Sequence, residues 1–200
     1  MPPEALSEDD EDECLTTRRL VLRRPHPAHA DAVTVLADNR RVAINLASLP
    51  HPYRRADALA WIEAAREQDP RAASFVICRR NPAGPEDIIG ACGFGLLPEK
   101  DDIEVGYWIG EPFWGQGFAT EAAQAVIDHA FACHGLAEIW ASCRVTNSGS
   151  RRVIEKCGFQ ARGMGMCRSR AVGGMVPVER FRLDRGAWTA LNAWSGGGEP

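Results

Sequence analysis

The sequence predicts one α/β domain, built on a mixed, mostly antiparallel sheet of about seven strands flanked by helices. Three segments with strand character, residues 73–79, 88–96 and 103–109, follow one another with only short turns between them, as in an antiparallel meander. The next segment changes period, because apolar residues within 119–131 recur at the spacing of one helix face. Another strand, a short helix and a closing pair of strands give the order β-α-α-β-β-β-α-β-α-β-β, which fits one sheet with helices on its faces.

Each expected element is bounded by turn or cap residues. Asp57 is placed to cap the helix after the irregular stretch, and Gly135 to close the long helix. Asn147 caps the short helix that Gly158 ends. In chain order we expect a strand over 16–23, a helix over 28–38, an irregular stretch over 40–56, a helix over 57–68, the three strands named above, a helix over 119–135, a strand over 138–145, a helix over 147–158 and two strands within 160–185.

The charge of the chain is unevenly distributed. The 200 residues carry a formal net charge of −4, but residues 1–13 hold seven acidic residues and no lysine or arginine. The rest then has 20 acidic against 23 basic residues, and this small positive charge gives little support to nucleic-acid binding. We expect a disordered acidic tail over 1–14, one folded domain over 15–194 and a flexible C-terminal tail over 195–200.

Composition excludes several other classes. No stretch approaches the roughly 20 apolar residues of a membrane-spanning helix, and the acidic N-terminus is unlike a secretory signal. The seven cysteines form no CxxC pair and match no zinc spacing, so we expect reduced thiols in the cytoplasm and no metal. The expected protein therefore has no membrane, metal or nucleic-acid partner.

The most informative segment is residues 103–122, IEVGYWIGEPFWGQGFATEA, where a strand leads through a glycine-bearing loop into the longest expected helix. The first turn of a helix presents unpaired N–H groups at the positive end of its dipole, and Gly115 and Gly117 keep side chains away from them. The loop lacks the lysine of GxxxxGK[ST], and Thr120 stands where GxGxxG has its third glycine. A site for an anion such as pyrophosphate and a plain structural turn are both open on this pattern alone.

Two phrases of the sequence resemble a known family. VGYWIGEPFWGQGFATEA and the later NSGSRRVIEKCGF are similar to motifs of the GNAT superfamily of acetyl-CoA-dependent N-acetyltransferases. PHPYRRADALAWI is a weaker match that resembles the RimJ/RimL-like branch, which includes ribosomal-protein N-terminal acetyltransferases. The likeness covers roughly residues 16–190 and implies a single GNAT-type domain.

The resemblance implies acetyl-CoA as co-substrate. Loop amides would bind its pyrophosphate, and the strand before the loop would pair with the pantetheine arm, one amide polarising the thioester carbonyl. Trp114 replaces the glutamine or arginine that is usual in the loop. Asn147 would contact pantetheine as well as cap a helix, and Arg151 or Arg152 would meet the 3′-phosphate unless it only faces solvent. The implied cofactor-binding residues are Tyr107, Trp108, Ile109, Gly115, Gln116, Gly117, Phe118, Ala119, Thr120, Asn147, Ser150 and Arg152.

The resemblance also implies two catalytic residues. Many GNAT enzymes carry, seven residues after this asparagine, a tyrosine that protonates the leaving thiolate, but Ile154 stands there. Ser150 would substitute as the acid, or would only hydrogen-bond pantetheine. Glu104 would act as the base toward the amine, through water, and its alternative is an ordinary solvated strand acid.

Together these observations predict an enzyme that transfers the acetyl group of acetyl-CoA to a primary amine of a protein N-terminus or small molecule. The amine would attack directly in a ternary complex, since no cysteine lies in a nucleophile pattern. The alternative is a non-catalytic CoA-binding regulatory module, which the missing tyrosine favours. The family resemblance makes a homodimer a possible assembly.

Overall fold

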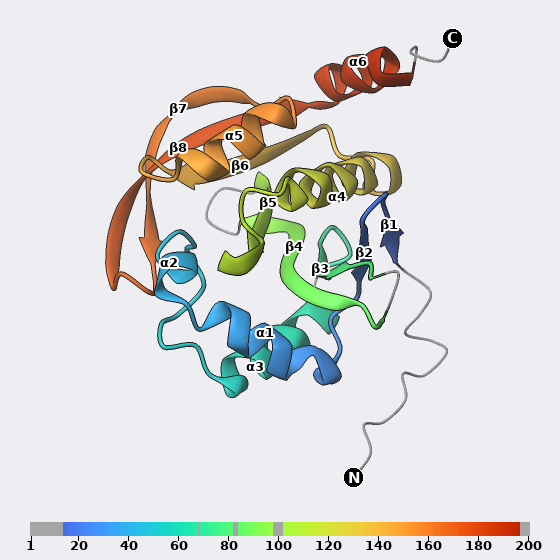
Figure 1. Ribbon diagram of the computed structural model, residues 1–200. Coiled ribbons are helices and arrows are strands. Elements are labelled where there is room, and N and C mark those ends of the chain that lie inside the picture. The colour runs from blue at the N-terminus through green and yellow to red at the C-terminus, as the bar shows by residue number, and fades with distance from the viewer. Residues whose placement is uncertain (1–13, 68, 82–83, 98–101, 197–200) are drawn as a thin grey trace.

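The fold is described by a computed structural model for residues 14–67, 69–81, 84–97 and 102–196. Within these ranges eight strands form one sheet in the order β1-β2-β3-β4-β5-β6-β8-β7 (Figure 1). The strands are β1 Leu15–Thr16, β2 Leu20–Arg23, β3 Ala73–Arg79, β4 Asp87–Leu97, β5 Asp102–Ile109, β6 Glu138–Arg144, β7 Gln160–Ser169 and β8 Gly174–Asp184. The helices are α1 Ala30–Ala37, α2 Arg40–Ala43, α3 Arg55–Arg66, α4 Phe118–His134, α5 Ser148–Lys156 and α6 Arg185–Gly196, with 3-10 turns at Pro27–His29 and Glu111–Phe113.

The predicted mixed, mostly antiparallel sheet is confirmed, with eight strands in place of about seven. The extra strand arises because the segment expected as one strand over 16–23 turns back on itself. The Thr17 N–H donates to the Leu20 carbonyl at 3.0 Å, so β1 and β2 pair antiparallel with each other.

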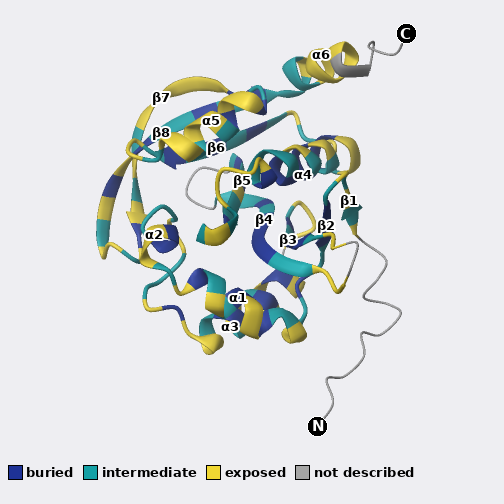
Figure 2. Ribbon diagram, viewed as in Figure 1, coloured by how far each residue is buried: buried dark blue, intermediate teal, exposed yellow. Residues whose placement is uncertain are grey.

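Helices cover both faces of the sheet, and the alternation of strand residues determines which core each side chain joins. On β2 and β3, Val21, Val76 and Cys78 belong to the core under α1 and α3. Their sequence neighbours Leu22 and Ile77 point the other way, into the larger core with α4 and α5. In Figure 2 both helix layers show buried residues toward the sheet and exposed ones away from it.

The sheet opens between its two central strands. β5 and β6 are the parallel pair, and they share the single register position Glu104↔Trp140, whereas β4 and β5 pair along eight positions. Beyond Glu104 and Trp140 the two strands separate, so their facing backbone groups lie at an opening in the middle of the sheet. This opening lies beside the loop that leads to α4.

The cap of α3 differs from the prediction. Asp57 was expected at the N-cap, but the helix begins at Arg55 and Arg54 is the N-cap residue. The Asp57 carboxylate instead reaches back from the first turn and accepts the Arg54 N–H at 2.8 Å. An acidic side chain at the third position of a helix can accept an unpaired N–H group at the helix start, as a cap residue does. The sequence pattern therefore predicted the start of α3 about one turn too late.

The last helix was missed in the sequence. Asp184 caps α6 by accepting the Ala187 N–H at 2.9 Å, and Trp188 stacks on Phe131 of α4 with ring centroids 5.0 Å apart. α6 continues to Gly196, into the range expected as a C-terminal tail. The expected acidic tail lies outside the described residues, apart from Cys14. None of the helices in the described part of the chain is long and apolar enough to cross a membrane.

Candidate active site

The loop before α4 holds two glycines in the left-handed region. Gly115 has φ +76° and Gly117, the N-cap residue of α4, has φ +81°, a backbone conformation that side chains disfavour. A Cβ at Gly115 would have no neighbour within 4 Å, so the approach to the loop is open. The first backbone N–H groups of the 17-residue helix α4 therefore face outward at the positive end of its dipole, as an anion site requires.

Arg19, on the β1–β2 turn, contacts this loop and helps to hold it in place. Its Nη1 donates to the Gln116 carbonyl at 2.9 Å, and its guanidinium lies 4.6 Å from the centroid of the Phe118 ring. Its Nε donates to the Glu121 carboxylate at 2.6 Å. Glu121 also accepts the Arg19 N–H at 2.8 Å and the Thr17 hydroxyl at 2.6 Å.

The Glu121 carboxylate is held in its charged form. Partial burial acts to raise its pKa, but the hydrogen bonds from Thr17 and Arg19 and the charge of Arg19 outweigh burial and leave the pKa below its ordinary value. A fixed carboxylate in the first turn of α4 keeps Arg19 on the loop. Sequence reasoning missed this support, since it joins residues about a hundred positions apart.

A shallow cavity of about 420 Å³ adjoins the loop. Its lining combines the β1–β2 turn, the first turns of α4 and the end of α5, namely Thr17, Arg18, Arg19, Gly117, Thr120, Glu121, Gln124 and Lys156. Among the described residues neither Arg18 nor Lys156 forms an ion pair, so both cations are available to an anion. Arg152, the predicted phosphate contact, is an exposed residue of α5 and does not line this cavity.

Tyr107 and Ser150 meet at the other end of the opening. The Tyr107 hydroxyl lies 2.9 Å from Ser150 Oγ, and it also donates to the Ser150 carbonyl at 3.2 Å. Burial raises the pKa of Tyr107, only partly offset by the hydrogen bond with Ser150, so the phenol stays protonated. Asn147 Oδ1 accepts the Ser150 N–H at 3.1 Å, which confirms the predicted helix cap. Ile154, at the usual tyrosine position, is a core residue with 2% exposure.

Glu104 lies on the opposite face of β5 from Tyr107, because the two residues are three positions apart on a strand. Its Oε2 accepts a hydrogen bond from the Ser142 hydroxyl at 3.2 Å. Glu104 is only half-buried. Gly106, two residues further along the same face of β5, has open space beside it, because a Cβ built there would have no neighbour within 4 Å. The structure thus brings Tyr107 and Ser150 together on one side of the opening and sets Glu104 on the other.

Comparison with known proteins agrees with this geometry. Residues 19–160 match the acetyltransferase (GNAT) domain family. The chain belongs to the GNAT acetyltransferase family. The predicted family and enzyme class, an acyltransferase, are thereby confirmed.

Individual relatives cover most of the chain. It is 27% identical over 174 residues to the uncharacterized N-acetyltransferase p20 of Bacillus licheniformis, covering 86% of this chain and 96% of that protein. It is 32% identical over 153 residues to the uncharacterized N-acetyltransferase YoaA of Bacillus subtilis, covering 75% of this chain and 84% of that protein. Among solved structures, RimL, a ribosomal L7/L12 alpha-N-protein acetyltransferase in complex with coenzyme A, matches with a TM-score of 0.73 at 22% identity over 88% of this chain and 99% of that chain. This last likeness shows the GNAT fold.

The roles of the individual site residues stay predictions. The structure gathers the loop residues 115–120 at the start of α4 and sets Tyr107, Trp108 and Ile109 at the end of β5, beyond its single pairing with β6. Arg18, Arg19 and Lys156 were not among the predicted site residues. Of the three, only Lys156 lies within a family-like phrase, NSGSRRVIEKCGF, whereas nothing in the sequence around Arg18 and Arg19 places them next to the loop.

Proposed function

We propose that this GNAT enzyme transfers the acetyl group of acetyl-CoA to a primary amine in a ternary complex. The observation that carries the proposal is the opening between β5 and β6 next to an exposed, glycine-lined helix N-terminus. One end of this arrangement suits the phosphates of the donor, and the other offers hydroxyl and carboxylate groups on its two sides. A branch assignment with the RimJ/RimL-like proteins, which points to a protein N-terminus as acceptor, is part of the proposal.

The donor site fits acetyl-CoA by the chemistry of its groups. The pyrophosphate would lie on the amides of residues 115–120, since those N–H groups have no partner within the helix. Arg18 and Lys156 beside them would take a further phosphate. The pantetheine arm is an amide chain, so it would pair with the free edge of β5 as a short added strand does, with Asn147 at its side. The bound thioester supplies an activated acyl carbon.

The acceptor amine must be neutral to attack. An N-terminal amine, with an ordinary pKa near 8, costs about 1 kcal/mol to deprotonate at pH 7, and a lysine-type amine costs roughly 4–5 kcal/mol. Glu104 would take this proton, directly or through water. The new C–N bond then forms as the C–S bond breaks, and the electron pair of that bond leaves on the CoA sulfur.

The CoA sulfur then needs a proton or a hydrogen bond. Ser150 is proposed to supply it, while the Tyr107 hydroxyl at 2.9 Å passes a proton to Ser150 and takes one from solvent in the same relay, so the phenol ends protonated. This pair would take the role for which many GNAT enzymes use the tyrosine that Ile154 replaces here. The alternative of a non-catalytic CoA-binding module thereby loses its motive, because hydroxyl groups are present at the opening.

The setting proposed for this activity is the cytoplasm. All seven cysteines are free thiols, and four of them are buried, which fits a reducing compartment. No group of three metal-ligating side chains occurs in the parts of the chain that the structure describes, and the proposed reaction uses only protein groups. A homodimer remains a proposal from the family.

The experiment combines calorimetric titration with acetyl-CoA and an assay of thiol release in the presence of amines. Gly117→Glu should weaken acetyl-CoA binding by at least about 50-fold, since it adds a strained side chain and a negative charge at the anion site. Gly135→Glu is the matched control, because it adds the same charge at a left-handed glycine at the other end of α4. Unchanged binding in Gly117→Glu would refute the donor site. Tight binding without thiol release on any amine would favour the non-catalytic module.

A further inference from the structure

The sheet face opposite α4 and α5 carries a polar strip along β6 and β8. Glu138, Trp140, Ser142 and Arg144 alternate with buried residues of β6 and so share this face. Arg182 and Arg180 of β8 are the register partners of Trp140 and Ser142, and they lie on the same face. Since Ser142 contacts Glu104, the strip continues the acceptor side of the proposed active site.

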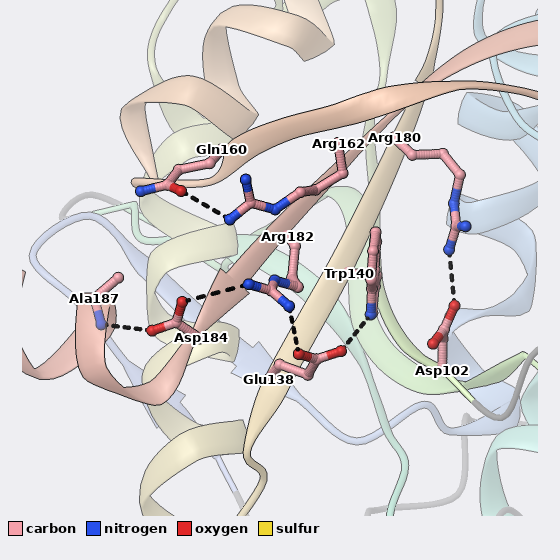
Figure 3. A network of polar contacts seen from close by, with 9 residues as sticks. All are labelled: Asp102, Glu138, Trp140, Gln160, Arg162, Arg180, Arg182, Asp184 and Ala187. Carbon is pink, nitrogen blue, oxygen red and sulfur yellow. Dashed lines mark hydrogen bonds and ion pairs between the residues drawn. The ribbon is translucent and has the colours of Figure 1, made fainter.

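Two of the arginines on this strip are paired with acids. Arg182 lies 3.2 Å from Glu138 and 3.9 Å from Asp184. Arg180 lies 2.7 Å from Asp102, and its guanidinium stacks 4.4 Å from the Trp140 ring centroid. Figure 3 shows these pairs side by side on the sheet. Each of these two positive charges is therefore compensated within the protein.

Arg144, the last residue of β6, is the exception. Its Nη1 donates to the Ile44 carbonyl at 2.7 Å, and its Nε is buried without a hydrogen-bond partner. Within the described residues no carboxylate lies within ion-pair distance of it. The Nε atoms of Arg180 and Arg182 also lack partners, so the missing carboxylate is what distinguishes Arg144. A half-buried guanidinium without an anion loses hydration that only an ionic partner restores in full.

The position of Arg144 relates it to the acceptor amine. Glu104 is level with Trp140 in the register of the two strands, and its carboxylate reaches forward to the Ser142 hydroxyl. Arg144 lies two residues beyond Ser142 on the same face, about 6.5–7 Å further along the strand. β5 and β6 form no backbone pairing beyond Trp140, so no strand-to-strand hydrogen bonds join them between Glu104 and Arg144. An acceptor whose amine lies at Glu104 thus has Arg144 within reach of a group a few bonds away.

We propose that Arg144 binds an anionic group of the acceptor, so that the preferred substrates are amines with a carboxylate or phosphate a few bonds from the nitrogen. This rests on the proposed acetyl transfer. An acidic N-terminal residue of a peptide, an acidic amino acid or an amino-sugar phosphate has this chemistry. Polyamines and aminoglycosides, which bring further positive charge to Arg144, do not.

The test uses acceptor pairs that differ only in the anionic group. Suitable pairs are Asp-Ala-Ala amide with Asn-Ala-Ala amide, glutamate with glutamine, and glucosamine 6-phosphate with glucosamine. The anionic member of the accepted pair should have a kcat/KM at least about tenfold higher. Arg144→Gln should reduce this ratio to about twofold through KM, with kcat retained, and Arg144→Lys should restore part of it. Arg66→Gln, an exposed arginine of α3, is the control and should keep the ratio.

Two outcomes would overturn the proposal while leaving acetyl transfer intact: equal rates for both members of each pair, or a charge preference that survives in Arg144→Gln. Turnover of no amine at all would instead refute the proposed function. A binding measurement then decides on Arg144 by itself. In NMR of arginine Nε–H groups, N-acetylglutamate should shift the signal that Arg144→Gln removes, and N-acetylglutamine should shift it far less. No shift would refute the anion site.

Discussion

The bond network of Glu121 predicts how strongly the β1–β2 turn supports the donor loop. Glu121→Gln keeps the shape of the side chain, but it removes the charge that accepts hydrogen bonds from Thr17 and from two nitrogens of Arg19. It also places the glutamine NH₂ group opposite the Nε–H of Arg19, so that two donors face each other. Hydrogen bonds to charged groups contribute about 1.5–3 kcal/mol each. A glutamine oxygen in the place of Oε1 still accepts the bonds from Thr17 and from the Arg19 N–H, so the bond from Arg19 Nε is the one that is lost. Since the Arg19 side chain is 34% exposed and screened by water, we expect a net loss of about 2 kcal/mol of unfolding free energy.

Urea unfolding at pH 7 measures this loss, and titration with acetyl-CoA should show binding weakened about fivefold, because Arg19 no longer fixes the Gln116 carbonyl. Glu155→Gln is the control: it breaks an exposed pair with Arg151 within α5, which water screens, and should cost much less unfolding free energy than Glu121→Gln. If both variants lost the same small free energy, the argument for a supporting carboxylate would be refuted.

The same carboxylate predicts a pH dependence. Its pKa in the folded protein lies below the ordinary value, so its stabilisation is complete above the unfolded pKa and is lost as pH falls through the folded pKa. The wild-type protein should therefore lose stability below about pH 4.5 more steeply than Glu121→Gln does. Parallel stability curves for the two proteins across this range would contradict the assignment.

Three further variants probe β5 and the elements next to it. Tyr107→Phe should lower kcat about tenfold with little change in KM and reduce the solvent isotope effect on thiol release, whereas a purely structural tyrosine would leave the isotope effect unchanged. Gly90→Ala would place a Cβ 2.1 Å from the Trp108 carbonyl, so it should destabilise the protein by at least about 2 kcal/mol in urea unfolding, and wild-type stability would show that β4 and β5 are not so close. Ile154→Tyr should lower the melting temperature without raising kcat, because position 154 is core, and a gain in kcat would show that it reaches the thiolate.

The fold was largely predictable because its signals are local. The meander of β3 to β5 and the apolar stripe of α4 follow from residue periodicity, and both are present in the structure. The glycine loop was predictable for the same reason, since strand, glycines and helix are contiguous. The errors also have local causes: β1 and β2 were merged because the turn at Thr17 contains no glycine or proline, and α6 was missed although Asp184 stands at its cap position.

The parts of the site that could not be predicted depend on pairs distant in the sequence. Arg19 meets Gln116 and Glu121, and Tyr107 meets Ser150, only because the sheet order brings β1, β5 and α5 around the start of α4. No spacing rule in one sequence contains these pairings. The missing tyrosine at position 154 pointed to Ser150 as a substitute donor by family resemblance, but only the structure shows a hydroxyl from β5 next to Ser150.

The alternation of side chains along β5 separates the two proposed catalytic groups of this strand. Glu104 and Tyr107 are three residues apart, so they face opposite sides of the sheet about 10 Å apart along the strand. In the proposed reaction, a thioester in the opening between β5 and β6 would be approached by the amine from the Glu104 side and protonated at sulfur from the Tyr107–Ser150 side. The proton lost by the amine and the proton gained by the thiolate would then not be the same one. A register slip of β5 by one residue would exchange the two faces, so the eight-position pairing with β4 is what fixes the chemistry of the strand.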